Sequence, residues 1–96
     1  MEPIVVAARV EYPGASPEQI EREVAIPLEL MLEKLQGVKA VTSRCDEGKL
    51  IVEVSFAGPA GKEELERVTK PVNGFKAATS AQIGAPLLSL EQPSVR

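Results

Sequence analysis

The sequence predicts an α+β domain in which two helices cover one face of a four-stranded antiparallel sheet. Short runs in which apolar and polar residues alternate have the period of half-buried strands. Between these runs, apolar residues recur at three- and four-residue steps, which is the period of an amphipathic helix. Segments rich in Pro and Gly separate the runs and mark turns. The 96 residues are enough for one small domain.

The first strand is expected at residues 4–11, which form a mostly aliphatic run. A Tyr-Pro-Gly turn follows, and the first helix is expected at residues 17–36. Ser16 is a suitable N-cap, and Pro17 stands at the first helical position, where its missing N–H costs nothing. Pro27 lies inside the helical pattern, where it removes a backbone hydrogen bond, so we expect a bend there.

Residues 38–45 and 49–56 are the expected second and third strands, joined by a tight hairpin. The second helix is expected at residues 62–78. Pro71 interrupts its pattern, so we expect this helix to be broken near residue 71. A final strand is expected at residues 86–91.

Two βαβ-type units that share one sheet give the ferredoxin-like βαββαβ sandwich, with strand order 4-1-3-2. Both helices then pack on one sheet face. The other face is expected to carry Val5, Ala7 and Ile51, with Ala40 as a further candidate. This apolar content favours a partner surface, although a small domain that leaves some aliphatic residues exposed explains it equally well.

The residue types present argue against an enzyme, a metal site or a cofactor site. There is no histidine, the commonest general base and a frequent metal ligand. Cys45 is the single cysteine and lacks a Cys-x-x-Cys partner. A net charge of −3 argues against nucleic-acid binding, and no apolar run approaches the roughly 20 residues of a membrane-spanning helix. We therefore predict a non-catalytic binding or interaction module.

Several segments together resemble a known family. Residues 12–18 read Tyr-Pro-Gly-Ala-Ser-Pro-Glu, residues 21–24 read Glu-Arg-Glu-Val, and residues 27–29 read Pro-Leu-Glu. In this order and spacing they resemble the first periplasmic segment of resistance–nodulation–division (RND) efflux transporters. The resemblance continues through residues 35–48, 65–68 and 87–96.

The resemblance implies that residues 1–96 are a single porter-type subdomain, excised from a longer pump and inactive alone. RND pumps are proton-driven trimers of the Gram-negative inner membrane, and they export drugs, detergents or metal ions. The chain would belong to the periplasmic portion of such a protein and contribute to the trimer pore and the substrate path. Its partners would be other porter subdomains and protomers, together with a periplasmic adaptor and an outer-membrane channel in the full pump.

By the same resemblance, the second helix lines the central pore and meets its counterparts there. The candidate pore or subunit-contact residues are therefore Leu65, Glu66, Val68, Thr69 and Lys70. The alternative hypothesis is a free-standing ferredoxin-like regulatory or ligand-binding domain that dimerises through its sheet. A tight dimer holding a small molecule would favour that alternative, whereas weak self-association of the isolated chain would favour a porter subdomain.

Overall fold

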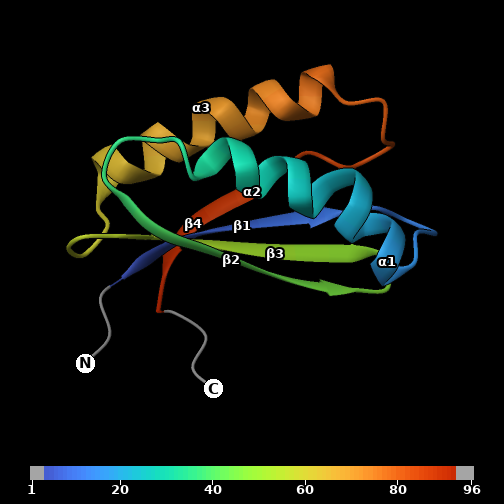
Figure 1. Cartoon of the computed structure of the whole chain (residues 1–96), viewed down its shortest axis with the longest axis horizontal. Helices are drawn as coiled ribbons and strands as arrows, with labels where there is room; N and C mark the ends of the chain where they lie inside the picture. The colour runs from blue at the N-terminus through green and yellow to red at the C-terminus, as the bar shows by residue number, and fades with distance from the viewer. Residues whose placement is uncertain (1–3, 93–96) are drawn as a thin grey trace.

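The computed structural model describes residues 4–92 and contains one four-stranded antiparallel sheet with helices on one face (Figure 1). The sheet order is β2-β3-β1-β4, which confirms the predicted 4-1-3-2 topology and the ferredoxin-like sandwich. The strands are β1 (Val5–Glu11), β2 (Val38–Asp46), β3 (Lys49–Phe56) and β4 (Leu87–Glu91).

The first helical region consists of three consecutive segments rather than one uniform helix. They are α1 (Pro17–Ile20), the π-helical segment η1 (Glu21–Ala25) and α2 (Ile26–Leu32). The irregularity expected at Pro27 takes the form of the π-helical segment, which lies directly before α2. A wider turn relieves the clash between a proline ring and the preceding carbonyls.

The helical region ends at Leu32, earlier than the predicted residue 36. The Lys34 N–H donates to the Met31 carbonyl at 3.3 Å, and the Leu35 N–H donates to the Leu32 carbonyl at 3.1 Å. These three-residue hydrogen bonds tighten the chain at the end of the helix. Gly37 follows with φ of 86°, a left-handed conformation that favours glycine.

The corner between β1 and α1 is tied to the tip of the β2–β3 hairpin. The Tyr12 N–H donates to the Gly48 carbonyl at 2.8 Å, and the Gly48 N–H donates to the Ala15 carbonyl at 3.0 Å. The Ser16 hydroxyl caps the helix by accepting from the Gln19 N–H at 3.2 Å, which confirms Ser16 as the N-cap. These bonds satisfy backbone groups at the corner and set the direction in which α1 leaves the sheet.

The second helix, α3 (Lys62–Ala78), runs without interruption through Pro71, so the predicted break near residue 71 is wrong. Val68 and Val72, on either side of the proline, are both 0% exposed. Phe75, the next apolar residue, packs against the same core. Proline in a helix interior costs about 3 kcal/mol, and burial of these residues offsets that cost because most helix stability in proteins comes from packing.

The core is an aliphatic layer between the sheet and the helices. Among the described residues, no polar or charged side chain is buried. Alternate residues of β1 and β3 meet one stripe of the first helical region and two valines of α3. The fully buried large side chains are Val6, Val10, Ile20, Val24, Leu28, Leu32, Leu50, Val52, Val54, Val68 and Val72.

The sheet face opposite the helices is only partly the apolar surface that the sequence suggests. Val5 and Ala7 lie on this face, yet they are only 3% and 0% exposed. Ala7 pairs with Glu53 on one side and Ser89 on the other, and Val5 pairs with Glu91. Leu87, which pairs with Arg9 on the same face, is 70% exposed, and Ala40 is exposed as well. This face therefore mixes polar residues with exposed apolar ones.

Leu28→Ala is expected to lower the free energy of unfolding by about 2–5 kcal/mol, because Leu28 is fully buried and its truncation leaves a cavity. Leu30→Ala is the matched control on the same helix. Leu30 is 56% exposed, so its truncation should cost less than about 0.5 kcal/mol. Urea unfolding followed by circular dichroism measures both, and equal losses would contradict this orientation of α2.

Candidate interaction surfaces

The helix α3 has a well-defined beginning. The Gly61 N–H donates to Glu64 Oε1 at 2.8 Å, and the Leu65 N–H donates to the Gly61 carbonyl at 2.9 Å. The first of these bonds, from the Gly61 N–H, holds the pKa of the Glu64 carboxyl below its usual value. An acidic side chain in the first turn also suits the positive end of the helix dipole. The start of α3 is thus positioned relative to the loop after β3.

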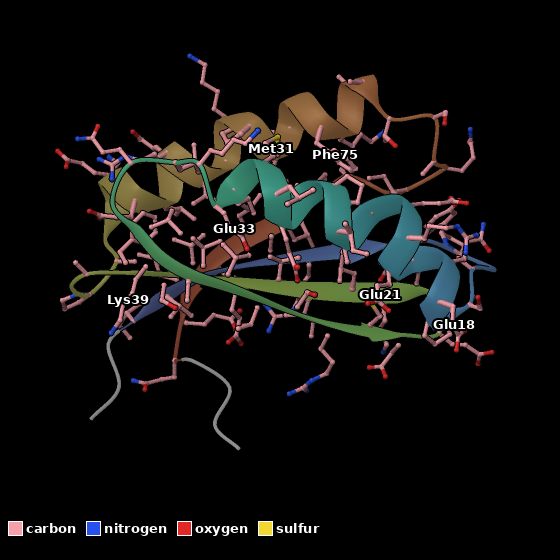
Figure 2. The ribbon with its side chains drawn as sticks, viewed as in Figure 1. Glu18, Glu21, Met31, Glu33, Lys39 and Phe75 are labelled. Atoms are coloured by element: carbon pink, nitrogen blue, oxygen red, sulfur yellow. The ribbon has the colours of Figure 1, made fainter. Side chains whose placement is uncertain are left out.

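The inner face of α3 packs against α2 and the sheet. Figure 1 shows α3 running beside α2 above the same sheet face. Met31 of α2 and Phe75 of α3 lie along the line where the two helices meet (Figure 2), and both are partly buried against the core. Arg67 adds a polar tie, because its Nη1 donates to the Gln36 carbonyl at 3.4 Å. With one face packed, α3 has a fixed outer face.

The predicted contact residues on α3 divide between these two faces. Glu66 and Lys70 are exposed and one helical turn apart. Leu65 is half-buried and packs against the core, and Val68 is 0% exposed. The half-buried Thr69 donates its hydroxyl to the Leu65 carbonyl at 2.7 Å. Only Glu66 and Lys70 of this set are therefore fully available to a partner on the outer face.

Asn73 extends this row and was missed by the sequence reasoning. It is exposed and stands three residues after Lys70 on a continuous helix, so it shares the outer face with Glu66 and Lys70. The expected break at Pro71 concealed it. The signal that reveals it is the apolar step from Val68 to Val72, which carries helical periodicity across the proline. We call Glu66, Lys70 and Asn73 the α3 outer row.

The opposite sheet face carries an ion pair that joins β4 to β1. Arg9 donates through both guanidinium nitrogens to the Glu91 carboxylate, with Nη2 at 2.8 Å from Oε1. The Ser89 hydroxyl also donates to Glu91 Oε2, at 2.6 Å. These bonds, that of Arg9 first, lower the pKa of Glu91 to about 2. A bidentate arginine–carboxylate pair has a strict geometry, so it fixes how the short edge strand β4 sits on β1.

A shallow hollow of about 230 Å³ lies on the same face, lined by residues of β2 and β3. It is smaller than the roughly 300–1,000 Å³ of typical small-molecule sites. Its lining includes Arg44, Ile51 and Glu53, and it contains no histidine. Within residues 4–92, no group of three His, Cys, Asp or Glu side chains is placed to hold a metal ion. The half-buried Cys45 has a pKa raised mainly by its burial, which disfavours the reactive thiolate.

Residues 1–78 match the family model described as the AcrB/AcrD/AcrF family. The matched region ends at Ala78, the last residue of α3. Over 54 residues, or 54% of this chain, the sequence is 41% identical to the protein named multidrug resistance protein MdtC from Salmonella arizonae. That alignment spans 5% of the MdtC sequence.

The fold is also similar to part of a solved protein described as a heavy metal efflux pump. The TM-score is 0.76 at 21% sequence identity, and the match covers 93% of this chain and 9% of the pump chain. At this identity the match shows the shared fold. The chain therefore corresponds to a small part of much longer relatives. Among its described residues, no helix is both long and apolar enough to span a membrane.

The pKa of Glu91, about 2 and thus below its ordinary 4.5, predicts a pH-dependent contribution to stability. The ionised carboxylate stabilises the fold above about pH 4.5, and this contribution is lost as the pH falls toward 2. We expect wild-type stability to exceed that of Glu91→Gln at pH 7 and the difference to shrink between pH 4.5 and 2. Thermal unfolding across this range measures it.

The control for this prediction is the same substitution in an Arg9→Met background. With the main hydrogen-bond donor removed, Glu91→Gln should have a much smaller pH-dependent effect. A stability difference between wild type and Glu91→Gln that stays constant from pH 7 to pH 2 would contradict the role of the ion pair.

Proposed function

Because the chain belongs to the AcrB/AcrD/AcrF family of RND efflux transporters, we propose that it is a periplasmic porter subdomain of such a pump. The family match runs from the first residue through the end of α3. The shared fold extends over 93% of the chain and so reaches beyond that match. Both observations support our proposal that residues 1–96 belong to a single porter-type subdomain.

In this proposal the subdomain is a structural and gating module of a trimeric, proton-driven pump and has no transport activity alone. The support is the small share of each relative that is matched. The alignment spans 5% of the MdtC sequence, and the structural match covers 9% of the heavy metal pump chain. Proton transfer and membrane anchoring would reside elsewhere in the parent protein. The subdomain would face the periplasm from an inner-membrane protein, and the full pump would engage an adaptor and an outer-membrane channel.

The α3 outer row is the proposed surface for contact with the other protomers of the trimer. The observation that carries this is the packing of α3, because Val68 and Val72 turn inward and leave Glu66 and Lys70 outward. Opposite charges one turn apart suit a rotationally symmetric contact, in which Glu66 of one protomer faces Lys70 of the next. Asn73 can add a neutral hydrogen-bonding group to the same row.

We propose drugs or similar organic solutes as the cargo of the parent pump. The support is the 41% identity to a protein named for multidrug resistance. The similarity to the heavy metal pump, at 21% identity, carries the fold and says nothing about cargo. This subdomain also lacks a metal-binding cluster among residues 4–92.

The alternative of a free-standing domain that dimerises through its sheet receives less support. Such dimers need an open sheet face with exposed apolar area. Here Val5 and Ala7 are buried within their own chain, and the Arg9–Glu91 pair occupies part of the surface between β1 and β4. Among the described residues, Leu87 is the one large apolar side chain that stands exposed on this face. The α3 outer row, and not the sheet, is therefore the surface on which we base the proposed function.

Lys70→Cys in the full-length parent pump is expected to form disulfide-linked protomers under mild oxidation, because the proposal places α3 helices against one another. The native thiol Cys45 is first replaced by Ser. Non-reducing gel electrophoresis measures the cross-linked fraction. Glu18→Cys is the matched control, because Glu18 is an exposed residue on α1, and it should remain uncross-linked. Efficient cross-linking from Glu18→Cys and none from Lys70→Cys would overturn the proposed contact.

A further inference from the structure

The buried residues of the first helical region have a spacing that a regular α-helix cannot keep on one face. Ile20, Val24, Leu28 and Leu32 are each 0% exposed, and each follows the previous one by four residues. An α-helix has about 3.6 residues per turn, so each four-residue step drifts by about 40°. Over three steps the drift reaches about 120°, which would carry Leu32 away from the stripe that begins at Ile20.

The π-helical segment η1 removes this drift. The Ile26 N–H donates to the Glu21 carbonyl, five residues earlier instead of four. A π-turn therefore holds one residue more than an α-turn. With that residue absorbed, the rotation from Ile20 to Leu32 matches about eleven α-helical residues, and the drift falls to about 20°. Both halves of the region then face the same layer of the core.

We infer that η1 is a register-correcting device: the helix carries one extra residue, and the π-turn stores it so that both apolar halves reach the sheet. Pro27 limits where the extra residue can sit. Because proline has no N–H, neither a four-residue nor a five-residue hydrogen bond can form at position 27. The widened turn is thereby stopped immediately before α2, as the structure shows.

A cluster of three side chains, Tyr12, Gln19 and Glu23, also holds the π-turn, from its N-terminal side. Tyr12 has its ring in the core and is 9% exposed. Its hydroxyl donates to Glu23 Oε1 at 2.5 Å and accepts from Gln19 Nε2 at 3.2 Å. Glu23 is the middle residue of η1, and Gln19 belongs to α1. The cluster thus connects the β1–α1 corner to the widened turn and fixes the position of the extra residue.

Deletion and insertion at one site test the device. In a Pro27→Ala background, which removes the proline clash, deletion of Arg22 should convert η1 into regular α-helix and keep the buried stripe aligned. Insertion of one Ala after Arg22 should misalign it. Arg22 is exposed, and its Nη2 lies 3.9 Å from Glu23 Oε2. The deletion also removes this exposed ion pair, which changes the equilibrium constant for unfolding by at most about fivefold and acts against the expected difference. We expect the equilibrium constant for unfolding to be at least about a hundredfold larger for the insertion than for the deletion.

Two outcomes would overturn the inference. An ordinary helix tolerates neither change, so equal losses for deletion and insertion would show that no residue is stored in the turn. A crystal structure of Pro27→Ala with Arg22 in place should still contain the π-turn. A regular α-helix there would show that the proline alone, and not the apolar spacing, causes it.

Tyr12→Phe tests the cluster separately, because it keeps the buried ring and removes only the hydroxyl. Hydrogen exchange of the backbone amides at Glu21–Ile26 is expected to accelerate by about tenfold, as for loss of a hydrogen bond to a charged group. The amides of Val68 and Val72 in α3 should be unchanged. Glu21→Gln is the control on the same turn, because Glu21 is exposed and lies outside the cluster, and it should have no such effect. If hydrogen exchange accelerated equally at all amides of the chain, Tyr12 would contribute only to general packing and not to the π-turn in particular.

Discussion

The layer of aliphatic side chains between the sheet and the helices orients every other element of the domain. With only three aromatic residues in the chain, this layer depends on close contact among many valines and leucines, so each helix must present a continuous apolar stripe. Two local irregularities are tolerated to satisfy that demand. The first helical region contains a π-turn, and α3 contains an internal proline. In both cases burial of the stripe outweighs the local cost in backbone hydrogen bonding.

The same constraint decides which surfaces are free. Because Val68 and Val72 face the core, helical geometry places Glu66, Lys70 and Asn73 on the outer face of α3. On the sheet, the first four residues of β1, Val5 to Ala8, are buried on both faces. Further along the strand, Arg9 is exposed on the face opposite the helices and pairs with Glu91. The domain therefore offers a polar helix face and a mixed sheet face, which are surfaces suited to contact with other protein parts of a larger assembly.

The corner after β1 connects the folding problem to the family relationship. The Tyr-Pro-Gly-Ala-Ser-Pro segment combines a turn, an N-cap and the base of the Tyr12 cluster, and its backbone is bonded to the β2–β3 hairpin. A short segment with so many positional requirements leaves a recognisable trace in the sequence. These requirements concern backbone direction and helix register, and none of them involves catalysis.

The sequence by itself determined the element order, the sheet topology and the N-cap at Ser16, because periodicity, turn residues and capping act within a few residues of each other. It also carried the family relationship, through residues 12–29. Only the tertiary structure decided that α3 continues through Pro71, that Val5 and Ala7 are covered, and that Asn73 joins the outer row. Each of these depends on neighbours distant in the chain. The pattern from Ile20 to Leu32 lies between the two cases. Its four-residue spacing is visible in the sequence, but only packing of both halves against the same sheet face turns that spacing into a π-turn.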